Sequence, residues 1–169
     1  IMTPKSLLRH RSAVSKKEDF INGSSFHRVL WDDEGTDKNF NLVSDKNIKR
    51  VIICSGKIYF DILEKRNSEK LSDIYILRIE QLYPFPEKSL SEELKRFSNA
   101  DFVWCQEEPK NQGAWSYIST LIVDELVKLS MKHQYLEYSG RAPSASPATG
   151  LAQQHKEEQE KLIKTALGI

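Results

Sequence analysis

The sequence predicts a three-layer α/β fold, in which a mostly parallel sheet carries helices on both faces. Short runs of apolar, often β-branched residues recur along the chain, and most are followed by a longer segment whose apolar residues have helical spacing. Strands that alternate with helices of this length are typical of βαβ units. The length of 169 residues suits a single domain with its own core.

The start of the chain is expected to form an arm rather than a packed element. It begins with basic residues, continues through serines, an asparagine and a glycine, and shows little periodicity. We therefore expect an arm or linker from a preceding domain at residues 1–25 and an α/β domain at residues 26–169. The domain opens with a short candidate strand, His27–Trp31, and a polar, loop-like stretch at 32–47.

Two apolar runs, Arg50–Cys54 and Ile74–Ile79, are predicted to be buried strands of a parallel sheet. Residues 57–66 lie between them and are predicted to form a helix. The inner face of this helix is expected to contain Ile58, Ile62 and Leu63.

The middle of the chain continues the same alternation. Pro86 is suited to the first position of a helix over residues 87–97, because the missing N–H of proline is not needed there. Residues 101–106 form the third predicted strand. The helix should bury Leu90, Leu94 and Phe97.

The last third is predicted to contain a polar loop at 107–112 and a long helix at 113–131. The apolar stripe of that helix is Ile118, Leu121, Ile122, Leu126 and Leu129. The remaining elements are a short strand at 134–138, a Pro/Ser/Ala-rich loop at 141–150, and a charged helix up to Leu167 that Thr149 is expected to cap.

Composition and spacing exclude several classes of function. The formal charge of +1 gives no reason to expect nucleic acid or an acidic membrane as a partner, and no apolar run is long enough to span a membrane. Cys54 and Cys105 each lie inside an apolar run, which predicts buried, reduced thiols in a reducing compartment. Neither cysteine and none of the four histidines has a second ligand at metal-binding spacing, and no Gly-x-Ser-x-Gly motif occurs. We therefore expect no catalytic, cofactor-binding or metal-binding residue in this chain.

A turn between the first buried strand and its helix is a candidate anion site. Ser55, Gly56 and Lys57 would present backbone N–H groups and the positive end of a helix dipole. Parallel strands end at one edge of the sheet, so Arg78 and the helix start at Gln112–Gly113 are expected nearby. The spacing is neither that of a P-loop nor that of a dinucleotide fingerprint, so a purely structural turn remains the alternative.

The segment from Gln106 to Trp115 is crowded with carboxylates and amides. Neighbouring Glu107 and Glu108 should point in different directions, which does not suit acid–base catalysis. The amides suit fixed hydrogen bonding better than proton transfer. We therefore predict an interface or ligand-contact role for four residues: Glu107, Glu108, Asn111 and Trp115.

Five separated motifs stand out along the chain: Met2–Arg9, Ser55–Tyr59, Arg78–Pro84, Gln106–Trp115 and Gly140–Gly150. In this order they resemble the final part of the thiamine-diphosphate-dependent decarboxylating subunit of 2-oxoglutarate dehydrogenase. More broadly they resemble the C-terminal domain of transketolase-type enzymes, and the likeness covers nearly the whole chain. The departures are small: Arg11 follows His10, and Arg141-Ala142-Pro143 replaces the more usual Arg-Pro-Ala order.

The resemblance implies a parent enzyme that decarboxylates 2-oxoglutarate with thiamine diphosphate and Mg²⁺ and passes the succinyl group to a lipoyl arm of the dihydrolipoyl succinyltransferase core. It implies a homodimer in which this domain serves assembly and effector binding, while the catalytic and cofactor residues lie in preceding domains. A bacterial cytoplasm is favoured over a mitochondrial matrix. Two alternatives stay open: a stand-alone module that senses a nucleotide or acyl-coenzyme A, and the matching domain of a related 2-oxo acid dehydrogenase.

Overall fold

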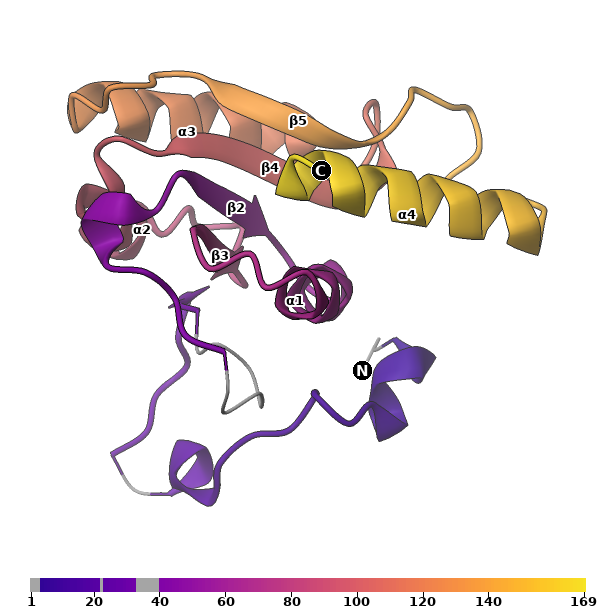
Figure 1. Ribbon diagram of the computed structural model, residues 1–169, viewed down its shortest axis with the longest axis horizontal. Helices are drawn as coiled ribbons and strands as arrows, with labels where there is room; N and C mark the ends of the chain where they lie inside the picture. Colours follow the sequence, from indigo (N-terminus) through magenta and orange to yellow (C-terminus); the bar gives the residue numbers. More distant parts are fainter. Residues whose placement is uncertain (1–3, 22, 33–39) are drawn as a thin grey trace.

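The computed structural model describes residues 4–21, 23–32 and 40–169, and over these it forms a five-stranded sheet flanked by helices (Figure 1). The strands are β1 (Val29–Leu30), β2 (Arg50–Cys54), β3 (Ile74–Ile79), β4 (Asp101–Pro109) and β5 (Leu136–Arg141). Their order in the sheet is β1-β3-β2-β4-β5. β2 is parallel to both β3 and β4, and β4 is parallel to β5, whereas β1 is antiparallel to β3.

The helices form the two outer layers. They are α1 (Ile58–Ser68), α2 (Glu87–Leu94), α3 (Trp115–Lys128) and α4 (Ala152–Leu167), with 3-10 turns η1 (Lys5–Arg9), η2 (Lys17–Phe20), η3 (Asp45–Asn47) and η4 (Lys95–Phe97). α1 and α4 pack with Ile52 and Cys54 on one face, and α2 and α3 pack with Val51 and Ile53 on the other. Successive residues of a strand point to opposite faces, which explains why β2 is apolar throughout. The structure confirms the predicted three-layer α/β fold.

The helices bury most of the residues expected on their inner faces. The residues expected on the inner faces of α1, α2 and η4 are all buried. α1 also buries Tyr59 and Arg66. Leu121 in α3 and Leu129 at the C-cap of α3 lie at the margin of the stripe and are only partly buried. The confirmed inner-face residues are Ile58, Ile62, Leu63, Leu90, Leu94, Phe97, Ile118, Ile122 and Leu126.

Two strands are longer than predicted. β4 continues through Pro109, where we expected a polar loop beginning at Glu107. Pro109 pairs with Arg141 after a register shift that begins at Cys105, so β5 also runs past its expected end at Tyr138. The two extensions depend on each other for their backbone hydrogen bonds, which no local sequence pattern reveals.

Two helix starts also differ from the prediction. α3 begins at Trp115 rather than Gly113, because Gly113 has a φ of +66°, a left-handed conformation that an α-helix does not contain. The cap of α4 is Leu151, and the buried hydroxyl of Thr149 makes no hydrogen bond to any described residue, so the predicted Thr149 cap is wrong.

The described residues of the N-terminal segment 4–25, called the arm below, lie outside the core of the sheet and its helices. None of the residues that form η1 and η2 is buried. In Figure 1 the arm loops away from the sheet and its N-terminal end returns beside α1, where the His10 ring lies 5.4 Å from the Phe60 ring, measured between centroids. In the described part of the chain, no helix combines the length and apolar character that crossing a membrane requires.

Candidate functional site

The C-terminal edge of the parallel strands is where α/β sheets place their sites. β2 ends there at Cys54 and is followed by the Ser55-Gly56-Lys57 turn, with Lys57 in the N-cap position of α1. Gly56 has a φ of +71°, and an added Cβ would meet nothing within 4 Å. Backbone conformation rather than lack of space therefore accounts for glycine at this position.

The ammonium group of Lys57 is held by acidic side chains of its own chain. Its Nζ lies 2.7 Å from Glu107 Oε1 and 3.1 Å from Asp61 Oδ2. The amide of Gln159 on α4 donates to the same two carboxylates, at 2.9 Å to Asp61 and 3.0 Å to Glu107. Burial lowers the pKa of Lys57, but the hydrogen bonds and charges of Glu107 and Asp61 outweigh it and raise the pKa overall. The charge expected to attract an anion is thus already balanced.

Arg78 is less completely paired. Its guanidinium stacks on Tyr59, 3.9 Å from the ring centroid, and its nearest ion-pair partner is Glu80 at 3.9 Å. Its Nε is buried and has no hydrogen-bond partner among the described residues. The Nε–H of Arg78 is therefore a buried hydrogen-bond donor, on a permanently charged side chain, that no described residue satisfies.

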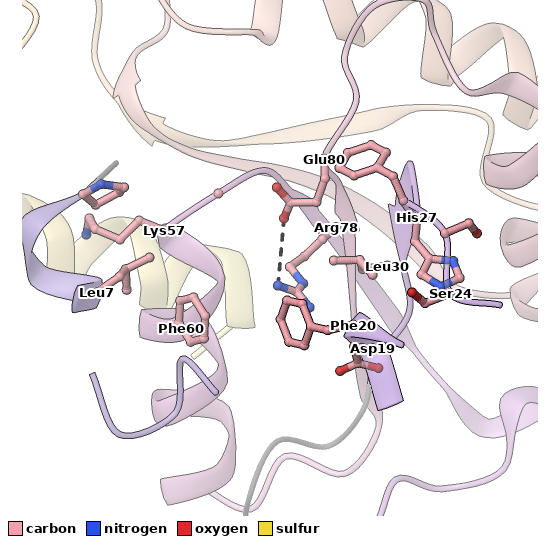
Figure 2. Close-up of a pocket in the computed structure, with 14 residues that line it drawn as sticks. Leu7, Asp19, Phe20, Ser24, His27, Leu30, Lys57, Phe60, Arg78 and Glu80 are labelled. Atoms are coloured by element: carbon pink, nitrogen blue, oxygen red, sulfur yellow. Dashed lines mark ion pairs between the residues drawn. The ribbon is translucent and has the colours of Figure 1, made fainter. Parts of the chain in front are cut away.

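Arg78 borders a pocket of about 680 Å³ between the arm and the domain (Figure 2). Gly56, Lys57 and Arg78 line the same pocket, so the structure brings these three predicted residues together, whereas Ser55 is not part of its lining. The arm contributes apolar residues such as Phe20 to the lining of this pocket.

Gln112 and Gly113 do not join this pocket. The start of α3 is closed by Gln106, whose Oε1 accepts from the backbone N–H of Trp115 at 3.0 Å. An added Cβ on Gly113 would lie only 3.0 Å from Gln106 Nε2. α3 also packs on the opposite face from α1. Gln112 and Gly113 therefore do not lie with Gly56, Lys57 and Arg78 at this pocket, and their role in anion binding stays a prediction.

Gln106 is a buried hydrogen-bonding centre that spacing alone did not reveal. Its Oε1 also accepts from Trp104 Nε1 at 2.9 Å. Its Nε2 donates to the carbonyl oxygens of Glu108, Pro109 and Gln112, at 3.2, 3.2 and 2.8 Å. One amide therefore fixes both the end of β4 and the turn into α3. The only signal in the sequence was its place as the first polar residue after an apolar run.

The residues predicted for an interface behave in different ways. Glu107 turns inward to Lys57, whereas Glu108 is exposed, which confirms that the two point apart. Asn111 forms two hydrogen bonds with the backbone of Ser144, each 3.0 Å long. Trp115 is half-buried, and its ring packs on Tyr138 with 4.9 Å between centroids.

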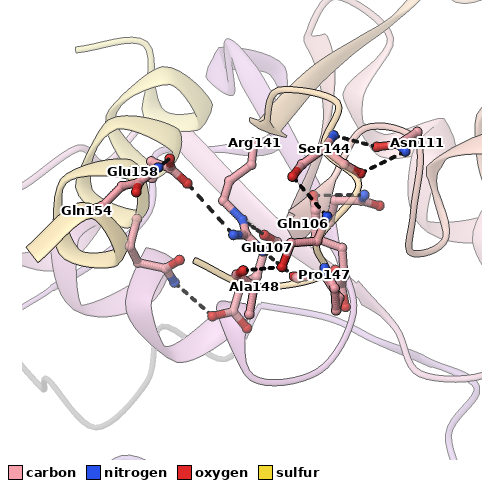
Figure 3. A network of polar contacts seen from close by, with 12 residues as sticks. Gln106, Glu107, Asn111, Arg141, Ser144, Pro147, Ala148, Gln154 and Glu158 are labelled. Atoms are coloured by element: carbon pink, nitrogen blue, oxygen red, sulfur yellow. Dashed lines mark hydrogen bonds and ion pairs between the residues drawn. The ribbon is translucent and has the colours of Figure 1, made fainter. Parts of the chain in front are cut away.

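Arg141 organises the loop that follows β5 (Figure 3). Its Nε donates to the carbonyl of Glu107 at 2.7 Å, and its Nη2 donates to the carbonyl of Pro147 at 2.5 Å. Its Nη1 lies 3.8 Å from Glu158 on α4. Arg141 thus links the Pro/Ser/Ala-rich loop to β4 through Glu107 and to α4 through Glu158. This role of Arg141 was not predicted, although a charged residue at the start of such a loop was a signal in the sequence.

No three His, Cys, Asp or Glu side chains gather among the described residues where a metal ion would bind. Cys54 and Cys105 are free and buried, as expected. Burial raises the pKa of Cys54 well above its usual value and that of Cys105 to about 12, so neither thiol is an activated nucleophile.

Comparisons with known proteins agree with the resemblance. Residues 14–167 match the family model described as 2-oxoglutarate dehydrogenase C-terminal. The chain is 50% identical to the 2-oxoglutarate dehydrogenase E1 component of Brucella abortus (strain S19), with 99% of this chain and 17% of that protein aligned. The E1 components of Brucella anthropi and Brucella ovis are 50% and 49% identical over the same shares. The chain spans 17% of the length of these curated relatives. It belongs to the 2-oxoglutarate dehydrogenase C-terminal family.

Proposed function

We propose that this chain is the C-terminal domain of a 2-oxoglutarate dehydrogenase E1 subunit, which decarboxylates 2-oxoglutarate and transfers the succinyl group to lipoyl groups. The observation that carries the proposal is the match of residues 14–167 to the C-terminal family. The domain serves assembly of the parent enzyme and does not perform its chemistry. The relatives compared are all bacterial, which supports a bacterial cytoplasm as its location.

Thiamine diphosphate and Mg²⁺ are the cofactors that the family resemblance implies for the parent. The described residues of this chain do not fit them, because they form no carboxylate cluster for a metal ion, and Lys57 at the strand ends is neutralised by carboxylates of its own chain. We therefore assign cofactor binding and catalysis to the part of the parent that lies outside this sequence.

The test is decarboxylation by the purified chain supplied with 2-oxoglutarate, thiamine diphosphate and Mg²⁺. We expect no carbon dioxide release above the buffer rate, with the full-length parent as the positive control. Turnover by the chain alone would overturn the assignment of catalysis to the rest of the parent.

The proposed partners are a second copy of the parent and the dihydrolipoyl succinyltransferase core. Glu107 and Asn111 are used inside the chain, so Glu108 and Trp115 remain as the expected contact residues. In the parent, Glu108→Lys should shift the monomer–dimer equilibrium toward monomer, as measured by analytical ultracentrifugation. Glu157→Lys, at an exposed position on α4, is the matched control. If both variants dimerise as tightly as the unaltered parent, Glu108 is not part of the dimer interface.

Effector binding is a second candidate function, favoured by the unpaired Nε of Arg78 at the pocket. We propose that a phosphate group of an adenine nucleotide or acyl-coenzyme A pairs with Arg78. A charge-assisted hydrogen bond contributes roughly 1.5–3 kcal/mol, so Arg78→Gln should weaken binding about 10-fold or more. Lys57→Ala should have a smaller effect, because its charge is shared between two carboxylates.

Calorimetric titration of the parent with AMP and with acetyl-coenzyme A tests this second function. If the parent binds neither compound, or if Arg78→Gln binds as tightly as the parent, the pocket does not serve as the effector site. That outcome would leave the assignment to the E1 subunit intact.

A further inference from the structure

Cys54 and Cys105 are far apart in the sequence but are neighbours in the sheet. They are in register on the adjacent parallel strands β2 and β4. Both belong to the buried cluster under α1 and α4, so their side chains point to the same face. Each is 0% exposed and neither forms a disulfide. Strand register, rather than sequence spacing, creates this pair of thiols.

The side chains packed in the same cluster as the pair are apolar, and the charged groups that act on the thiols, such as Arg78 and Glu107, lie outside this cluster. Ser139 on β5 is in register with Cys105, and its hydroxyl donates to the carbonyl of Leu162 on α4 at 2.6 Å. No third Cys, His, Asp or Glu completes a metal-binding group with them among the described residues. The packed neighbours include Ile52, Ile58, Ile62, Ile76, Leu162 and Ala166.

We propose that Cys54 and Cys105 form a binding site for a soft divalent cation that takes two thiolate ligands in a line, the class represented by Hg²⁺. Binding breaks the two S–H bonds, forms two sulfur–metal bonds and releases two protons to solvent. No electron is transferred. The product is a bis-thiolate complex with no net charge.

Charge selects this class of ion. Burying a net charge in an apolar interior is strongly unfavourable, so a neutral complex is the form that this site tolerates. A monovalent soft ion such as Cu⁺ would leave one negative charge on the two thiolates. Zn²⁺ prefers four ligands in structural sites, and the surrounding isoleucines supply none. The two sulfurs alone satisfy a two-coordinate divalent ion.

Strand geometry favours a bridging atom over a direct disulfide. Neighbouring strands are about 4.8 Å apart, and side chains in register on parallel strands leave the sheet side by side. A disulfide needs its two Cβ atoms within about 3.5–4.5 Å. An inserted metal atom widens the span between the sulfurs, so Cys54 and Cys105 can both bind it without drawing β2 and β4 together.

Access to the site depends on α4. Residues 152–157 at the start of α4 are exposed, and the helix is held to the sheet farther along, where Leu162, Ala166 and Leu167 are buried. Opening of α4 by local unfolding would uncover the thiols. Metal uptake should therefore be slow, and Leu162→Ala should speed it by about 10-fold or more because it removes a buried anchor.

The experiment is titration of the purified chain with HgCl₂, followed by the ultraviolet thiolate-to-metal charge-transfer band and by native mass spectrometry. We expect one Hg²⁺ per chain. Both Cys54→Ala and Cys105→Ala should release Hg²⁺ to a competing monothiol at least about 100-fold faster, because each loses the advantage of two linked ligands. Ser139→Ala is the matched control, because Ser139 is in register with Cys105 on the neighbouring strand but carries no sulfur. This variant should retain the metal.

Circular dichroism confirms that each variant is folded before titration. Binding of two Hg²⁺ ions per chain would show that the thiols act independently and would overturn the proposal. Release from the unaltered chain as fast as from either single-cysteine variant would do the same. Uptake that is equally fast in Leu162→Ala and in the unaltered chain would overturn the role of α4 in access.

Discussion

Replacing Gln106 with alanine should cost the domain about 3–5 kcal/mol of unfolding free energy, a large loss for one polar side chain. The amide makes five hydrogen bonds. Two of its acceptors keep another donor: the Glu108 carbonyl accepts from Tyr138 Oη, and the Pro109 carbonyl accepts from the backbone N–H of Gln112. The groups deprived of this partner are Trp104 Nε1, the Trp115 N–H and the Gln112 carbonyl. Each such group costs about 1–3 kcal/mol when it stays buried, and water entering the vacated space recovers part of the sum.

Equilibrium unfolding in urea measures this loss as a shift of the midpoint at constant slope. Gln154→Ala is the matched control, because Gln154 is an exposed amide that bonds to Glu158 within the same helix. The control should change stability by about 0.5 kcal/mol or less. A loss below about 1 kcal/mol for Gln106→Ala would refute the view that this amide holds the end of β4 and the start of α3 together.

Further predictions concern the arm, two tyrosines, one glycine and one buried ion pair. Limited proteolysis of the isolated chain should trim the first 25 residues or so before the rest, since η1 and η2 bury no residue, and protection equal to that of the sheet would contradict this. Burial raises the pKa of both Tyr75 and Tyr138 to about 12. The folded protein therefore holds these protons more tightly than the unfolded chain, whose tyrosines ionise near 10, so stability should fall between about pH 10 and 12. Ultraviolet titration should show the two late ionisations, and a flat stability profile over that range would argue against them. Gly113→Ala should cost about 1–3 kcal/mol in urea unfolding, because it combines a positive φ with a close contact to Gln106. Arg66→Met should lower the unfolding free energy by about 3–5 kcal/mol, because it removes the ion-pair partner of the buried Asp32 carboxylate. An unchanged unfolding free energy would show that water reaches the pair.

The central strands were predictable because their signal is local. Arg50–Cys54 and Ile74–Ile79 match the observed β2 and β3, and a run buried on both faces is apolar at every position. The ends of β4 and β5 were not predictable in the same way. Pro109 belongs to a strand because Arg141 pairs with it, and that pairing lies in the tertiary structure rather than in either segment.

The candidate site was predicted only in part, and the reason is geometrical. The rule that parallel strands end at one edge correctly brought Gly56, Lys57 and Arg78 to one pocket. The same rule does not say which face of the sheet the next helix covers. It therefore did not predict that α3 and α1 lie on opposite faces. The rule also does not predict that Glu107 neutralises Lys57. Glu107 lies within the register shift between β4 and β5, so the direction of its side chain depends on how the two strands pair.

The pairing of polar groups along this edge supports a structural role for most of it. Lys57, Gln106, Asn111 and Arg141 all bond to other parts of the same chain. Groups paired in this way are fixed before any partner arrives, so they can present a rigid surface, but they have little capacity left to bind a ligand. Arg78 differs because its buried Nε lacks a partner among the described residues and its pocket is bordered by the arm. Any ligand-binding function of the domain at this edge should therefore depend on Arg78 and on the position of the arm, and it should be lost when the arm is removed, even though the sheet stays folded.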